Sequence, residues 1–137
     1  MTMLRMALAG ATMLVAGSAM ASEHLVGTRT TAESDNRGAR VGSKDGLGEG
    51  DALMAGSDEV WTFTVEERQG NGFHAEWCSE NLCEDAVGVI RADGESILVA
   101  DEDGIFIGTL GEDMLELCYL EPGADVRIAD CHTLSKE

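Results

Sequence analysis

The chain of 137 residues carries 26 Asp and Glu against 9 Lys and Arg, a formal net charge of −17, and 44% of its residues are hydrophobic. This length suits one domain rather than two, and the hydrophobic content argues against a wholly disordered chain. The acidic excess would repel nucleic acid and anionic lipid, so neither is expected as a partner.

The first 21 residues have the features of a cleaved signal peptide. Arg5 precedes an apolar, alanine-rich run over 6–16 that is too short to span a bilayer, and Ala19-Met20-Ala21 is a small-x-small cleavage site. We expect cleavage before Ser22, one mature domain over 22–137 in the periplasm or outside the cell, and no membrane insertion afterwards. The alternative is a retained N-terminal anchor, although the apolar core of an anchor is usually longer.

The mature chain begins with one predicted strand and one predicted loop. Residues 24–32 alternate as an opening strand. Residues 33–58 are rich in Gly, Ser and charge, with little apolar periodicity. We predict a mobile loop over 33–58 that carries one ragged strand around Ala39-Arg40-Val41.

The first hairpin is predicted on either side of Gly70-Asn71-Gly72, where two groups of three apolar residues alternate with polar ones. A three-residue loop over 70–72 pairs Gln69 with Phe73 and Val65 with Trp77. This register places all six apolar side chains on one face of the ribbon. The six residues are Trp61, Phe63, Val65, Phe73, Ala75 and Trp77.

Asp93-Gly94 predicts the next hairpin, with a two-residue turn. It pairs Ile90 with Ile97 and Val89 with Leu98, which makes both faces of that ribbon apolar.

Two more turns follow at 101–104 and 111–113. The second is predicted as a three-residue loop that sets Ile107 opposite Leu117.

The last hairpin joins 114–120 to 126–134 with Ala124-Asp125 at its tip, so that Cys118 lies opposite Cys131. Directly opposed residues are within reach of a disulfide, and an exported protein meets an oxidising compartment. Among the three pairings we therefore favour Cys78–Cys83 with Cys118–Cys131. The alternative is a four-thiolate zinc site, which usually needs two close cysteine pairs. Here only the first pair is close.

These elements amount to seven strands after residue 60 and one before it, with no convincing helical periodicity. Eight successive antiparallel strands can close into a small up-and-down β-barrel, which removes exposed strand edges. The predicted class is therefore all-β, a barrel of about eight strands. A two-sheet β-sandwich is the alternative.

The opening segment Leu25-Val26-Gly27-Thr28-Arg29-Thr30, followed by a meander, resembles the start of avidin-like and lipocalin-like barrels, although Arg29 stands where such strands usually carry an aromatic residue. More closely, the chain resembles a set of exported bacterial proteins without an established activity. That resemblance is carried by 63–67, 87–90, 101–104 and Leu115-Glu116-Leu117-Cys118-Tyr119-Leu120. It implies the barrel fold and supplies no site residues.

Candidate catalytic and metal sites are weak in this sequence. His132 shares the strand parity of Ile128 and Leu134, so we interpret it as an inward, hydrogen-bonded core residue; His24 and His74 have no such position. Residues 101–104, with Glu112 closing a twelve-residue loop, could ligate calcium. However, Phe106 stands where such a loop requires glycine, so a solvated turn is favoured. G-x-S-x-G, H-E-x-x-H and phosphate-loop motifs are absent from the sequence. We expect no catalysis, no cofactor and no bound metal.

The leading hypothesis is an exported binding protein whose barrel mouth, or the segment 33–58, holds a ligand. Its expected partner is a small apolar ligand or a basic protein surface. The aromatic residues that would line the site, or else simply fill the core, are Trp61, Phe63, Phe73, Trp77 and Tyr119. The alternatives are an inhibitor of an exported hydrolase, such as a protease or lysozyme, and an envelope structural or stress protein.

Overall fold

The computed structural model describes residues 24–31, 37–45, 48–55 and 59–136. The predicted signal peptide and its cleavage site lie outside these residues. The described part of the chain consists of strands and turns, and within it there is no helix long and apolar enough to cross a bilayer.

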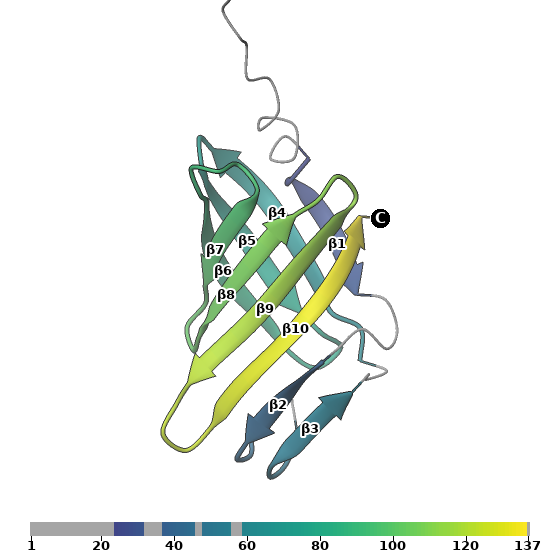
Figure 1. The fold of residues 1–137 in the computed structure, drawn as a ribbon, viewed down its shortest axis with the longest axis vertical. Helices are drawn as coiled ribbons and strands as arrows, with labels where there is room; N and C mark the ends of the chain where they lie inside the picture. The colour runs from purple at the N-terminus through teal and green to yellow at the C-terminus, as the bar shows by residue number, and fades with distance from the viewer. Residues whose placement is uncertain (1–23, 32–36, 46–47, 56–58, 137) are drawn as a thin grey trace, which may run out of the picture.

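Eight strands form a closed antiparallel barrel (Figure 1). Adjacent strands pair in the order given below, and the last pairs back with the first. The predicted all-β, eight-stranded barrel is therefore confirmed. The barrel strands are β1 (Gly27–Thr31), β4 (Thr62–Gln69), β5 (Gly72–Cys78), β6 (Cys83–Ile90), β7 (Ser96–Ala100), β8 (Ile105–Leu110), β9 (Met114–Pro122) and β10 (Arg127–Lys136).

Two further strands, β2 (Arg37–Val41) and β3 (Ala52–Ala55), extend the sheet beside the lower part of the barrel in Figure 1. The long β10 makes this possible, because residues 134–136 pair with β1 while 127–131 pair with β2. Part of the segment 33–58 that was predicted as a loop forms these two strands, and the ragged strand expected at 39–41 lies within β2. Residues 33–36, 46–47 and 56–58 of that predicted loop lie outside the described residues. Apolar periodicity could not reveal β3, because backbone pairing holds it in place while its Leu53 is 90% exposed.

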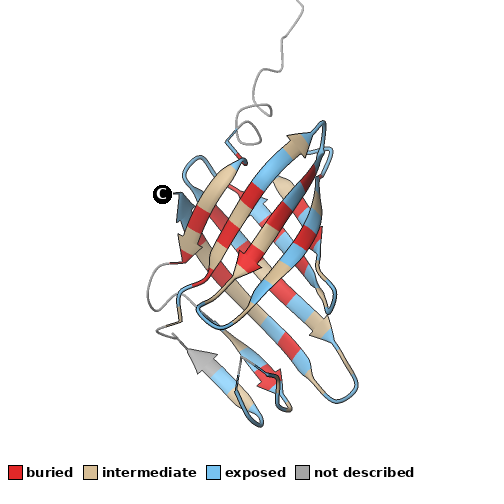
Figure 2. Ribbon diagram, turned by 180° about the vertical axis from the view of Figure 1, so that it is seen from behind, coloured by how far each residue is buried: buried red, intermediate tan, exposed pale blue. Residues whose placement is uncertain are grey.

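The barrel interior is filled by side chains from alternate strand positions, seen as buried bands across the strands in Figure 2. All six apolar residues of the first hairpin are buried, as predicted. Arg29, in β1, is also buried. Its Nη1 donates a hydrogen bond to the Leu25 carbonyl at 2.7 Å, and its Nη2 donates to the His24 carbonyl.

The register predicted for the first hairpin was wrong, although its buried face was right. Gln69 pairs with Gly72 across a two-residue turn, in which Gly70 has a φ of 60°. Continued unchanged, this register would set Val65 opposite Glu76. A β-bulge between Val65 and Glu67 shifts the pairing by one residue, so Val65 lies opposite Ala75 and the apolar face is restored.

The other turns differ in how well they were predicted. The Asp93-Gly94 hairpin has the expected pairs, Ile90 with Ile97 and Val89 with Leu98. The β8–β9 hairpin is one residue out, because the Gly111 amide donates to the Met114 carbonyl at 2.7 Å and closes a tighter turn. Ile107 therefore pairs with Cys118 rather than with Leu117.

Both predicted disulfides are present, Cys78–Cys83 across the β5–β6 turn and Cys118–Cys131 between β9 and β10. Since all four cysteines are paired, a four-thiolate zinc site is ruled out. The two bonds are consistent with the oxidising compartment expected for an exported protein.

Candidate functional site

One end of the barrel, which we call the mouth, gathers the turns β5–β6, β7–β8 and β9–β10, at the lower end in Figure 1. The β2–β3 connection lies at the same end, because β2 runs antiparallel to β10 and ends at Val41, opposite Arg127. The Cys78–Cys83 bond fixes the β5–β6 turn, which brings Leu82 to the mouth.

Four carboxylates lie at the mouth, three of them on strands β6, β9 and β10 and the fourth directly after β7. Glu84 and Asp130 share the inward parity of their buried neighbours on β6 and β10, and Glu121 that of Tyr119 on β9. Asp101 follows β7, and its Oδ1 accepts hydrogen bonds from the amides of the turn, Asp103 at 3.0 Å and Gly104 at 2.6 Å. The carboxylate oxygens of Glu84, Glu102 and Asp103 also lie within 4.8 Å of one another.

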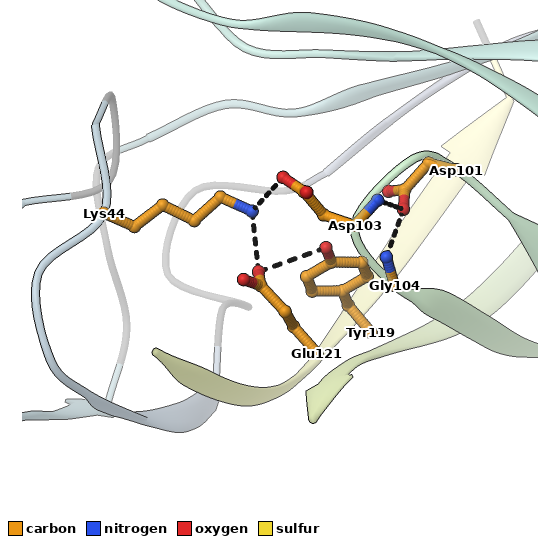
Figure 3. A network of polar contacts seen from close by, with 6 residues as sticks. All are labelled: Lys44, Asp101, Asp103, Gly104, Tyr119 and Glu121. Carbon is orange, nitrogen blue, oxygen red and sulfur yellow. Dashed lines mark hydrogen bonds and ion pairs between the residues drawn. The ribbon is translucent and has the colours of Figure 1, made fainter. Parts of the chain in front are cut away.

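Lys44, from the β2–β3 connection, reaches across the mouth into this acidic cluster (Figure 3). Its Nζ donates to Glu121 Oε2 at 2.6 Å and to Asp103 Oδ2 at 2.9 Å, and it lies 5.9 Å from the centre of the Tyr119 ring. The Tyr119 hydroxyl donates to the same Glu121 oxygen at 3.3 Å. The Lys44 side chain is only 14% exposed. An ammonium group is thus held by two carboxylates and one aromatic face.

The β2–β3 connection is shaped by Arg40, a buried side chain of β2. Its Nε donates to the carbonyls of Gly42 and Gly50, both at 3.1 Å, and its Nη2 donates to that of Glu49 at 3.3 Å. These bonds draw the two ends of the connection together, and a Lys44–Gly48 backbone bridge narrows it. The loop is therefore built around a buried guanidinium, and it presents Lys44 to the barrel.

Lys44 and a group of aromatic side chains line a cavity of about 20 Å³, which we call the mouth cavity. Trp61 and Trp77 stack at 4.9 Å, and the His132 ring packs edge-on against Trp77 at 5.2 Å. This volume holds about one water-sized group. The cavity is lined by Lys44, Trp61, Trp77, Leu82, Glu84, Tyr119, Asp130 and His132.

Several buried polar atoms here have no hydrogen-bond partner among the described residues. They include Trp61 Nε1, His132 Nδ1 and Asp130 Oδ1, whose side chains all line the mouth cavity, and Oδ2 of the nearby Asp101. His132 Nε2 lies 3.3 Å from Asp130 Oδ2. With its hydrogen on Nε2, toward Asp130, the neutral ring presents an acceptor lone pair at Nδ1. Buried polar atoms in native proteins are normally satisfied, so these atoms would pair with a water molecule or with a polar group of similar size.

The charges at the mouth shift the pKa values of three groups. Burial, followed by the charges of Asp101, Glu121 and Glu84, raises the pKa of Tyr119 far above its usual range. Burial raises the pKa of Glu84, and nearby carboxylates, Asp101 first, add to the rise although Lys44 opposes it. Burial alone would lower the pKa of Lys44, but its bonds to Glu121 and Asp103 outweigh this and raise it.

The structure brings together three of the five aromatic residues expected to line a site. Trp61, Trp77 and Tyr119 line the mouth cavity, whereas Phe63 and Phe73 are buried in the core and do not line it. The predicted inward position of His132 is confirmed, since it is 1% exposed. His24 and His74 are exposed.

The calcium loop that was weighed for 101–104 does not form. Glu112 lies in the β8–β9 turn, at the other end of β8 from Asp101 and Asp103. Asp101 instead caps its own turn through the bonds described above.

The sequence interpretation missed the four inward carboxylates and Lys44. Strand parity could have found the carboxylates, because Glu121 follows inward Tyr119 by two residues and Asp130 precedes inward His132 by two. No sequence signal marks Lys44, since its approach depends on the pairing of β2 with the far half of β10.

Neither a family model, nor a curated protein, nor a solved structure matches this chain.

Proposed function

We propose that this chain is an exported, non-catalytic binding protein whose ligand site is the mouth cavity. One observation carries the proposal: Trp61 Nε1 and His132 Nδ1 are both buried and unpartnered among the described residues, and both side chains line one cavity. The Trp61 N–H donor and the His132 ring nitrogen are thus preorganised for a ligand whose polar groups form hydrogen bonds with both.

The chemistry of the lining favours binding over catalysis. The mouth offers two groups that could act as nucleophiles after losing a proton, Lys44 and Tyr119, and the pKa of each is raised. Both are thus kept protonated near neutral pH, which is the opposite of the activation that a nucleophile requires. His132 and Asp130 form a polar pair of the kind that can activate a hydroxyl or a thiol. Among the described side chains that line the cavity, the only hydroxyl is that of Tyr119, and there is no thiol.

The size of the cavity bears on the kind of ligand. The mouth cavity, at about 20 Å³, is too small for a bulky apolar molecule. We therefore propose that only the polar head of a ligand enters, while its body lies where the Lys44 side chain now runs.

The test is a fluorescence titration, because Trp61 and Trp77 are the only tryptophans in the chain and both line the cavity. The probes are butylammonium, butyrate, butanol and butyramide, which differ in their polar head. We expect a saturable change with one of them, and its loss in His132→Phe, which keeps an aromatic side chain and removes both ring nitrogens. His74→Phe, on the exposed face of β5, is the matched control. Flat titrations with all four probes, together with a native mass equal to that of the bare chain, would reject the proposal.

A further inference from the structure

We propose that the mouth is selective for primary alkylammonium groups, and that Lys44 is an internal competitor occupying the place of such a ligand. This inference rests on the proposed function and names the chemical class of the ligand. The side chain of Lys44 is itself a butylammonium group, and it enters the mouth end-on (Figure 3).

The groups around the Lys44 ammonium are those that bind such a cation. Two carboxylate oxygens accept from Nζ, at 2.6 Å from Glu121 and 2.9 Å from Asp103, and the face of Tyr119 lies 5.9 Å away. A primary ammonium has three donors and no acceptor. Together these contacts provide two charged acceptors and a cation–π contact.

The unpartnered atoms of the mouth cavity, with that of Asp101, extend this preference for donors. When ionised, the carboxylate oxygens Asp130 Oδ1 and Asp101 Oδ2 accept hydrogen bonds and cannot donate them. His132 Nδ1 also accepts when the ring hydrogen is on Nε2. His132 is 1% exposed and lines the mouth cavity, so this nitrogen is shielded from bulk water. The single unpartnered donor, Trp61 Nε1, leaves room for one acceptor on the ligand, such as a hydroxyl or carbonyl oxygen.

Electrostatics point the same way. Glu84, Asp101, Asp103, Glu121 and Asp130 surround the mouth, and Lys44 is the one cation among the residues that line the cavity. Removing Lys44 would leave the carboxylates facing one another without a counter-charge. Such a site attracts a replacement cation and rejects an anion.

The central experiment is chemical rescue of Lys44→Ala with butylammonium chloride, followed by calorimetry and tryptophan fluorescence. We expect Lys44→Ala to bind butylammonium at least tenfold more tightly than the unchanged chain, and at least tenfold more tightly than it binds butanol, which has the same length without the charge. Bound butylammonium should also restore the lost thermal stability. Lys136→Ala, which removes a lysine at the opposite end of the barrel, should behave as the unchanged chain.

A second variant tests the acceptor. Glu121→Gln in the Lys44→Ala background should weaken butylammonium binding by about tenfold or more, because a charge-assisted hydrogen bond becomes a neutral one. If Lys44→Ala does not fold, Lys44→Gln replaces it, since an amide can still donate to Glu121.

Two sources could present this group, a free alkylamine and a lysine side chain of another protein. Two further probes distinguish them in Lys44→Ala, 1,4-diaminobutane and N-acetyl-lysine amide. Tighter binding of the diamine identifies a free amine, and tighter binding of the lysine derivative identifies a protein lysine.

The results that would overturn the inference are distinct from failure of the proposed function. Saturable binding of butyrate, butyramide or butanol, but not of butylammonium, would keep the binding site and reject the ammonium class. Binding of Ca²⁺ without any amine would do the same. A loss of stability in Lys44→Ala that no amine restores would show that Lys44 is only a clamp for the β2–β3 connection.

Discussion

Glu84 illustrates how a single inward carboxylate departs from ordinary core chemistry. It lies on the inward face of β6, at the mouth end of a strand whose other inward residues include buried Ala86 and Ile90. Burial and the negative charge of Asp101 raise its pKa. Its charged form is therefore disfavoured by the fold, which is common for residues placed for binding rather than for stability.

We predict that Glu84→Gln raises Tm at pH 7 and has little effect near pH 4. A carboxyl group whose pKa is raised on folding contributes stability below its unfolded value, about 4.3, and that contribution is lost as pH rises through the folded pKa. The neutral amide does not suffer this loss. Thermal unfolding at both pH values measures the effect, and Glu116→Gln, on the exposed face of β9, is the control. A lower Tm at pH 7 would mean that the Glu84 charge is stabilising.

Tyr119 allows a second prediction at this scale, because it is the only tyrosine in the chain. Its pKa is raised by burial and by neighbouring carboxylates, so the folded protein should hold the phenol proton well above pH 10, where an unfolded tyrosine loses it. Stability should fall as pH rises above about 10, since the unfolded state then binds fewer protons than the folded state. The retained proton on Lys44 acts in the same direction.

The measurement is absorbance at 295 nm during alkaline titration, with circular dichroism recorded in parallel. We expect phenolate absorbance to appear only together with loss of the β-sheet signal. In concentrated urea the same tyrosine should titrate near pH 10. Ionisation near pH 10 while the β-sheet signal is unchanged would contradict the buried environment.

At the scale of elements, turns and strands were predictable where a local pattern determines them. Asp93-Gly94 fixes its hairpin, and the tip at Ala124-Asp125 places Cys118 opposite Cys131. The bulge at Glu66 was not predictable, because it only corrects the register that the Gly70 turn imposes. Strand β3 was missed since it buries little and depends on backbone pairing to β2. The mouth depends on the pairing of β2 with β3, because Lys44 lies in their connection.

A prediction at the scale of elements concerns the stability effect of replacing Gly88, which lies opposite an aromatic side chain. Gly88 of β6 pairs with Phe73 of β5, and a Cβ on Gly88 would lie 2.1 Å from the Phe73 ring. Gly88→Ala should therefore destabilise the fold by about 1–3 kcal/mol through overpacking. Gly72→Ala, on the neighbouring strand, meets its nearest atom at 3.7 Å and should change stability by less than about 0.5 kcal/mol.

Urea unfolding of both variants compares these two costs. Equal losses would show that the backbone freedom of glycine, and not the room beside Phe73, is what these positions need.

At the scale of the whole molecule, the barrel closes its own edges and still adds two strands, because β10 is long enough to serve both β1 and β2. Closure was predictable from the even spacing of turns. The shared use of β10 was not, since it is a long-range choice between two partners for one strand. The chain thereby gains a loop across one open end of the barrel, and among the described residues that line the mouth cavity this loop carries the only lysine or arginine.

The net charge of −17 should govern how the whole molecule responds to salt. Lys44 forms favourable ion pairs that salt would weaken, but such pairs contribute about 1 kcal/mol or less when they are partly exposed. Repulsion among the excess carboxylates acts over the entire compact state and is relieved on unfolding. We therefore predict that Tm rises with NaCl, by roughly 4–8 °C for each kcal/mol of repulsion that is screened. Most of the rise should occur below about 0.2 M, where the screening length falls to less than about 10 Å.

Thermal unfolding at 0.02, 0.2 and 1 M NaCl distinguishes this behaviour from a general salt effect, which would continue steadily to 1 M. A fall in Tm over the same range would mean that local ion pairs, with Lys44 foremost, outweigh the repulsion.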